Sequence, residues 1–170
     1  ANFTKKIDYI FYFGANFNVN QRDNLKNEIK ILEKIKKLNP KKIIFTSSGA
    51  VYKKKNIKYK KLKLKIENFI SKNFKKKNVL ILRCFTFVGP FLENSGNFAI
   101  TQIARSLISK EKLIINNSNT VRSFLAIDKF ILFIFKIFNN KNGILDVGST
   151  KKLKLIELVY QIKSKIKSNT

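Results

Sequence analysis

The chain has 170 residues, and 44% of them are hydrophobic, enough for one domain or for part of a larger one. Its formal net charge is +26, from 36 Lys and Arg residues against 10 Asp and Glu residues. Because its single cysteine, Cys84, excludes an internal disulfide framework and favours a reducing compartment, we expect a cytoplasmic protein.

The first half of the chain alternates apolar runs with amphipathic stretches. Strands are predicted at Ile7–Phe13, Ile43–Thr46 and Val79–Leu82, because short continuous apolar runs are typical of strands that are buried on both faces. Helices are predicted between them at Asn20–Lys37 and Lys58–Phe74, where apolar residues recur at spacings of three and four. This alternation predicts an α/β fold in which the three strands are adjacent and parallel in one doubly wound sheet.

The pattern is looser after Pro90. The expected elements are a helix over Phe98–Ser109, a strand over Leu113–Ile115, a helix from a cap at Asp128 to Phe138, a strand over Gly143–Val147 and a closing helix over Leu155–Ile166.

The positive charge raises the alternative of a nucleic-acid or anionic-membrane partner. Only four of the 36 cations are arginines, and Lys is over-used together with Asn, Ile and Phe, whose codons are rich in A and T. We attribute the charge mainly to an A/T-biased genome, since a nucleic-acid surface more often uses the planar fork of Arg. The most apolar run, Phe130–Phe138, is interrupted by Lys136 and is far shorter than a membrane span. We therefore expect neither nucleic acid nor a membrane as partner.

Three side chains near the second predicted strand could form an acid–base site. Ligands of open α/β sheets lie beyond the carboxyl ends of the strands, and Ser48 follows such an end. Tyr59 and Lys63 are one helical turn apart and share a face. An ammonium group beside a phenol lowers the phenol's pKa, which is ordinarily about 10, and so helps it to act as a base near neutral pH. In a lysine-rich chain, however, this pair also arises by chance, and a surface Tyr on a basic helix is the alternative.

Five stretches occur in a particular order along the chain, namely FTSSGAVY, YKKLKLKIENFI, LILRCFTFVGP, VRSFLAIDKF and GILDVGSTKKLKLIELV. In that order they resemble the extended short-chain dehydrogenase/reductase family, the NAD-dependent sugar-nucleotide epimerases and dehydratases, over nearly the whole chain. The resemblance implies that residues 1–90 are the C-terminal part of a Rossmann-like NAD-binding domain with a partial doubly wound parallel sheet. It implies a small α+β substrate-binding region in residues 91–170, an NAD(P) cofactor, a nucleotide-sugar substrate and compatibility with a homodimer.

The resemblance also assigns roles to single residues. Ser48 matches the family's catalytic Ser or Thr, Tyr59 matches the catalytic base, and Lys63 matches the residue that lowers the pKa of that base and binds the nicotinamide ribose. Gly14 and Ala15 match a loop of small residues where the backbone approaches the cofactor closely.

Further matches concern substrate binding and the helix predicted at Lys58–Phe74. Arg122 matches an Arg that binds the pyrophosphate of a sugar nucleotide with two parallel hydrogen bonds. Thr86 stands where the family's third-strand motif often has Asn, and we expect it to contact the substrate. Glu67 matches a frequent helix Glu, for which we expect a structural role. No metal site is expected.

Three departures from the family pattern bear most directly on the activity. The glycine-rich dinucleotide fingerprint is absent from the 170 residues, so we expect an N-terminally truncated chain without appreciable NAD-dependent turnover by itself. The segment between Ser48 and Tyr59 is about half the family's usual length. Gly49 and Ala50 follow Ser48 where 4,6-dehydratases carry an Asp-Glu pair, which favours epimerisation or keto reduction over dehydration. The alternatives are a non-catalytic remnant of this fold and a basic nucleic-acid-binding module.

Overall fold

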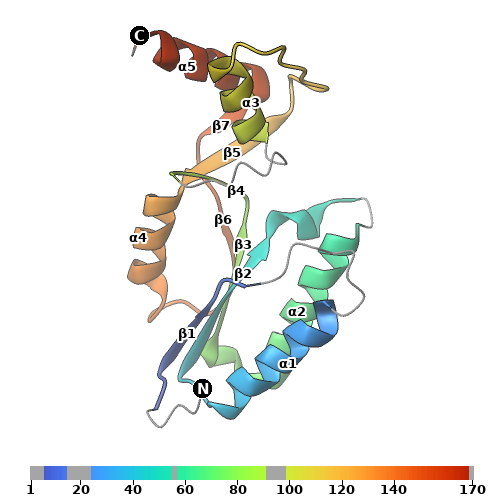
Figure 1. Cartoon of the computed structure of the whole chain (residues 1–170). Helices are drawn as coiled ribbons and strands as arrows, with labels where there is room; N and C mark the ends of the chain where they lie inside the picture. The colour runs from blue at the N-terminus through green and yellow to red at the C-terminus, as the bar shows by residue number, and fades with distance from the viewer. Residues whose placement is uncertain (1–5, 15–23, 55–56, 91–98, 169–170) are drawn as a thin grey trace. The chain divides into compact units, whose positions relative to one another are not determined.

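The structure is a computed structural model that describes residues 6–14, 24–54, 57–90 and 99–168. Its elements in chain order, labelled in Figure 1, are β1 (Tyr9–Tyr12), α1 (Asn24–Lys37), β2 (Lys42–Ser48), the short 3-10 helix η1 (Gly49–Tyr52), α2 (Lys58–Asn73), the 3-10 helix η2 (Lys76–Asn78), β3 (Val79–Cys84), β4 (Thr86–Val88), α3 (Ala99–Ile108), β5 (Val121–Ala126), α4 (Ile127–Ile137), β6 (Gly143–Val147), β7 (Lys152–Lys154) and α5 (Leu155–Ser168).

The chain forms two compact units. The first contains Ala1–Phe85 and Phe133–Val147, and the second contains Thr86–Leu132 and Gly148–Thr170.

The first unit is built on a four-stranded parallel sheet with the strand order β1-β2-β3-β6. The prediction that the first three strands are adjacent and parallel is therefore confirmed. In the register of the sheet, Ser48 at the end of β2 is paired with Cys84 at the end of β3, and Cys84 is paired with Val147 at the end of β6. The carboxyl ends of these three strands thus meet at one edge.

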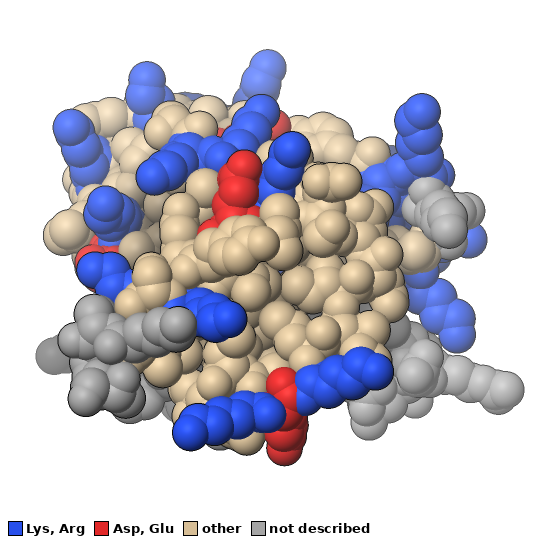
Figure 2. Space-filling model, turned by 90° about the horizontal axis from the view of Figure 1, so that it is seen from above, with Lys and Arg blue, Asp and Glu red and all other residues tan. Residues whose placement is uncertain are grey.

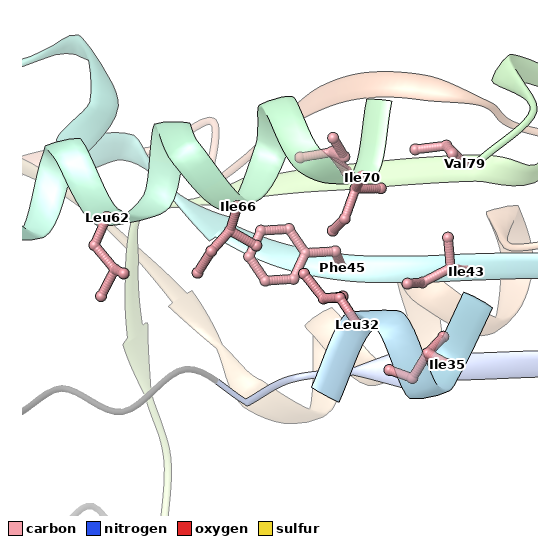
Figure 3. Close-up of a cluster of buried hydrophobic side chains, with 9 residues drawn as sticks. Leu32, Ile35, Ile43, Phe45, Leu62, Ile66, Ile70 and Val79 are labelled. Carbon is pink, nitrogen blue, oxygen red and sulfur yellow. The ribbon is translucent and has the colours of Figure 1, made fainter. Parts of the chain in front are cut away.

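Helices α1 and α2 pack together on one face of this sheet (Figure 1). The apolar side chains that the two helices and the strands β2 and β3 bury between them, all but Ile81 labelled in Figure 3, are Leu32, Ile35, Ile43, Phe45, Leu62, Ile66, Ile70, Val79 and Ile81. Several of them are fully shielded from solvent, and the burial of each such side chain stabilises the fold by roughly 1.5–3 kcal/mol. This cluster fixes α2, which carries Tyr59 and Lys63, against the strand that ends in Ser48.

The opposite face of β1 contacts aromatic side chains from the end of α4 and the residue after it. The Tyr9 and Phe11 rings lie 5.0 and 5.7 Å from the Phe138 ring, and the Phe11 ring also lies 6.1 Å from the Phe135 ring. Because side chains alternate along a strand, β1 presents these rings to one layer while Ile10 packs on the other.

The second unit contains a three-stranded sheet with the order β4-β5-β7, in which β5 runs parallel to β4 and antiparallel to β7. Helices α3 and α5 form its core around Ile103, Leu155 and Leu158. The predicted strand at Leu113–Ile115 is wrong, because this segment has no strand structure. Its apolar ends, Leu113 and Ile115, instead pack on the core as irregular chain.

The second unit corrects two further expectations. Asp128 does not cap α4, because the helix already begins at Ile127; Asp128 lies in its first turn, where a carboxylate interacts favourably with the helix dipole. The three strands β4, β5 and β7 were not expected from the sequence.

The surface is rich in lysine. Figure 2 shows Lys and Arg side chains distributed over the face drawn there, with uncharged surface between them. Within the described ranges, no helix is both long enough and apolar enough to span a bilayer.

Candidate active site

The Ser48 side chain is held in a tight turn at the carboxyl end of β2. Ser48 is the N-cap of the short helix η1, and its Oγ accepts a hydrogen bond of 3.2 Å from the backbone N–H of Ala50. The turn passes close to the Phe85 ring, since a Cβ added at Gly49 would lie 2.6 Å from two ring carbons. Position 49 therefore requires glycine as long as the Phe85 ring keeps its place.

Tyr59 lies in the first turn of α2, facing this turn. Its side chain is half-buried, and a hydrogen bond joins the side chains of Tyr59 and Ser48. The shortened segment between the two residues thus still allows their hydroxyl groups to meet.

Lys63 lies one helical turn after Tyr59 and is buried, with only 4% of its surface exposed. Its Nζ donates a hydrogen bond of 3.0 Å to the carbonyl oxygen of Thr46, and it lies 4.9 Å from the Phe45 ring centroid and 5.7 Å from the Tyr59 ring centroid. Burial lowers the pKa of Lys63 to about 8, although nearby acidic groups, first among them Glu28, act in the opposite direction. The ammonium group therefore begins to lose its proton at a pH only slightly above neutral.

The pKa of the Tyr59 phenol is raised, contrary to the expectation that Lys63 would lower it. Burial is the main cause, and the hydrogen bond with Ser48 acts against it. Two observations explain why Lys63 does not lower this pKa. Its ammonium group faces the Tyr59 ring and is hydrogen-bonded to Thr46, and a lysine with a pKa of about 8 is uncharged at the pH where the phenol ionises.

Two buried groups beside Lys63 were not identified from the sequence. Glu28 on α1 is 6% exposed and accepts a hydrogen bond from the Tyr12 hydroxyl, and the Tyr12 ring stacks on Phe45 at 5.8 Å. Cys84 is 6% exposed, and burial raises the pKa of its thiol to about 12 while the charge of Lys63 lowers it. The sequence does not place either group beside Lys63, because each approaches Lys63 only through the fold.

The other predicted site residues belong to other segments of the chain. Gly14 follows β1 in the same unit, and Ala15 lies outside the described residues. Thr86 begins β4 and Arg122 lies exposed on β5, both in the second unit. The structure therefore brings together Ser48, Tyr59 and Lys63, while the ligand contacts assigned to the other four residues stay predictions.

No group of three or more His, Cys, Asp or Glu side chains that could hold a metal ion occurs among the residues that the structure describes.

Comparison with known proteins gives a consistent family assignment. The model of the NAD dependent epimerase/dehydratase family matches residues 2–148. No curated protein sequence matches the chain.

Solved structures with a similar fold include sugar-nucleotide enzymes. UDP-N-acetylglucosamine 4-epimerase from Methanobrevibacter ruminantium is 20% identical, with a TM-score of 0.78 over 94% of this chain and 61% of that one. UDP-glucose 4-epimerase from Thermotoga maritima is 17% identical, with a TM-score of 0.77 over 92% of this chain and 60% of that one. A dTDP-glucose 4,6-dehydratase from Bacillus anthracis, solved with NAD, is 18% identical, with a TM-score of 0.76 over 94% and 57%. The 170 residues thus span about three fifths of the length of these structures.

Proposed function

Because the chain belongs to the NAD-dependent epimerase/dehydratase family, we propose that it supplies the proton-transfer half of an enzyme that uses NAD(P) to oxidise and reduce a nucleotide sugar. The observation that carries the proposal is the hydrogen bond between the Ser48 and Tyr59 side chains, with Lys63 one helical turn further along α2. The solved structures of similar fold support the substrate class, since they are named for UDP- and dTDP-sugars.

In this proposal Tyr59 removes the proton of a sugar hydroxyl. NAD, when bound, supplies the acceptor for the hydride that leaves the carbon bearing that hydroxyl. Without substrate the Tyr59–Ser48 hydrogen bond favours the phenolate, and with substrate bound the single Ser48 proton can instead be donated to the sugar oxygen that loses its proton. Positioned acid–base groups of this kind contribute about 10²- to 10⁴-fold to a rate.

The residues present fit the nicotinamide end of a dinucleotide. The Tyr59 hydroxyl and the Lys63 ammonium are donors on one face of α2, and Gly14 follows β1, the strand next to β2. The Lys63 ammonium is buried and bound to Thr46, so contact with a ribose hydroxyl requires this hydrogen bond to be shared or exchanged. A bound dinucleotide would also add positive charge near Tyr59 in its oxidised form, which favours the phenolate.

Within this class, epimerisation or keto reduction fits the site better than dehydration. Elimination of water needs an additional acid–base pair, and positions 49 and 50 carry glycine and alanine. An acidic side chain at position 49 would also collide with the Phe85 ring, because even a Cβ there lies 2.6 Å from it.

The sugar nucleotide itself is proposed to contact Thr86 and Arg122. Arg122 is exposed on β5, and its planar fork suits a pyrophosphate. In this scheme residues 1–90 serve the dinucleotide and residues 91–170 the substrate, in a cytoplasmic enzyme for which a homodimer remains a proposal.

The test uses the protein in the form that its gene encodes, with the 170 residues and whatever adjoins them. UDP- and dTDP-hexoses are incubated with NAD, the corresponding keto-sugar nucleotides are incubated with NADH, and the products are separated and identified. Isomerised sugar without net consumption of NAD supports an epimerase, and stoichiometric oxidation of NADH with a keto-sugar supports a reductase. Loss of water from the sugar contradicts the preference against dehydration, and absence of every one of these reactions contradicts the proposed function in favour of a non-catalytic remnant.

A further inference from the structure

A chain of hydrogen bonds in the first unit links residues that are next to the candidate site in β2, η1 and α2. It begins at the Ser47 hydroxyl, which donates to Oε1 of Glu67 on α2. Glu67 is only 4% exposed and also accepts from Arg83, at 2.7 Å from Nη2 and 3.2 Å from Nε. The carboxylate thus has two charge-assisted hydrogen bonds with the fork geometry that makes Arg–carboxylate pairs strong and directional.

The same guanidinium group reaches the other end of the Ser48 turn. Arg83 Nη1 donates to the Tyr52 hydroxyl at 2.8 Å, and this hydroxyl donates to Oδ1 of Asp146 at 2.8 Å. The guanidinium carbon also lies 5.0 Å from the centroid of the Tyr52 ring. Ser47, Arg83 and Asp146 are register neighbours on β2, β3 and β6, so the network crosses three strands.

This network holds the two elements that carry the proposed site. Ser47 immediately precedes Ser48, and Tyr52 ends the helix η1 that Ser48 caps. Glu67 lies on α2 one turn after Lys63 and two turns after Tyr59, and therefore on the same side of the helix. One guanidinium–carboxylate pair, Arg83–Glu67, therefore binds Ser47 and Tyr52 on the two sides of the Ser48 turn. Through Glu67 the same pair is part of the face of α2 that bears Tyr59.

We propose that Glu67 and Arg83 are positioning residues, which fix the Ser48 turn against α2 so that the Ser48 and Tyr59 hydroxyl groups stay in hydrogen-bonding contact. The proposal rests on the proposed function for its purpose, but the geometry that it describes exists without substrate or cofactor. Neither residue touches the reacting groups; they act through Ser47 and Tyr52.

Two observable quantities report on this geometry without any turnover. The first is the pKa of the Tyr59 phenol, which the hydrogen bond with Ser48 lowers; it can be followed by NMR of labelled tyrosine ring carbons and assigned with Tyr59→Phe. The second is the reactivity of Cys84, the only cysteine of the chain, which is buried and paired in register with Ser48. Its rate of modification by a thiol reagent measures how often this edge of the sheet opens.

The main variant is Ser47→Ala combined with Tyr52→Phe. It removes two hydroxyl groups and leaves the Glu67–Arg83 ion pair in place, so the buried carboxylate keeps its partner and the fold is retained. We expect the pKa of Tyr59 to rise by as much as it does in Ser48→Ala, and Cys84 to react about tenfold faster, the factor that one to two lost hydrogen bonds represent. Tyr9→Phe with Ser71→Ala removes the same two kinds of hydroxyl group elsewhere in this unit and should change neither quantity.

A combined variant separates positioning from a general loss of stability. When Ser48→Ala is added to the main variant, the pKa of Tyr59 should rise no further, because the contact with Ser48 is already lost. Arg83→Lys keeps the charge but not the fork, and should give an intermediate rise. A Tyr59 pKa and a Cys84 rate that remain at their wild-type values in the main variant would overturn the proposal, and so would a full additional rise when Ser48→Ala is added. Failure of the turnover assay leaves these measurements unaffected, so the two proposals fail separately.

Discussion

The two units of the chain build their cores in different ways. In the first unit the central strands β2 and β3 are buried, and side chains such as Phe45, Ile66 and Leu80 are fully shielded. In the second unit β4 and β7 have three residues each, and the buried centre comes mainly from helices α3 and α5 through Ile103 and Leu158. Acid–base groups need a support whose side chains are locked by packing, and the first unit provides it. The candidate site therefore lies on the unit whose central strands and covering helices are the most fully buried.

The largest effect is expected from equal truncations in the two cores. Ile66→Ala should lower the free energy of unfolding of the first unit by about 3–5 kcal/mol, because Ile66 is fully buried between α2 and the sheet. Leu158→Ala should cost about 2–3 kcal/mol in the second unit, where Leu158 is 7% exposed and its surroundings can adjust. Native-state hydrogen exchange of amides in each unit measures both values. An equal or larger loss for Leu158→Ala would contradict the difference between the cores.

The next effect is a dependence of stability on pH that arises from Lys63. Its pKa is about 8 in the folded chain and 10.5 for an ordinary lysine, so the unfolded state binds more protons between these values. The free energy of unfolding should therefore rise with pH above about 8, by up to about 1.4 kcal/mol per pH unit. The Cys84 thiol, with a pKa of about 12 instead of 9.0, opposes this rise above pH 9.

Denaturant unfolding at a series of pH values between 8 and 9 measures this contribution. Lys63→Met should remove it, whereas the same substitution at the exposed Lys65 on the same helix should leave it unchanged. Cys84→Ala should extend the rise to higher pH. A pH profile that Lys63→Met leaves unaltered would show that the Lys63 ammonium is not the buried group described here.

An effect of similar size is expected where the Ser48 turn meets Phe85. Gly49→Ala should cost about 1–3 kcal/mol, because the new Cβ would lie 2.6 Å from the ring. Phe85 is 46% exposed, so Phe85→Ala alone should cost less than a core truncation. In the combined variant the cost of Gly49→Ala should disappear. Strictly additive costs in thermal unfolding would contradict the close contact of turn and ring.

The smallest effect concerns the exposed ion pair of this unit. Lys41 and Asp8 are joined at 3.0 Å, but their side chains are 61% and 41% exposed. Asp8→Asn should change the free energy of unfolding by less than about 1 kcal/mol, and the change should fall further at high salt. A loss that is large and independent of salt would contradict the view that stability in this unit comes from its buried layer.

The difference between the units also explains what the sequence could predict. Buried strands such as β2 and β3 are continuous apolar runs, and these two strands and the partly buried β1 are predicted from such runs. Strand β5 mixes Arg122 and Ser123 with apolar residues, and β7 is a single Leu between two lysines. Their strand structure depends on pairing with each other, which no local pattern in the sequence expresses.

The same reasoning applies to the candidate site. The spacing of Tyr59 and Lys63 and the strand end at Ser48 are local features, and from them the sequence predicted which side chains converge. The partners of Arg83 are 16 and 31 residues away in sequence, and those of Tyr52 extend to 94 residues, so the network needed the fold to be seen. The raised pKa of Tyr59 was missed because it depends on burial.

The most direct test of the central claim is the effect of Tyr59→Phe on NAD-dependent turnover of a nucleotide sugar by the protein that the gene encodes. The variant removes one hydroxyl group, so the fold should persist and the rate should fall by at least about 10²-fold. Tyr160→Phe is the matched control, because Tyr160 is 66% exposed on α5 in the second unit, and its rate should equal that of the wild type. A Tyr59→Phe protein that turns over at the wild-type rate would contradict the assignment of Tyr59 as the base.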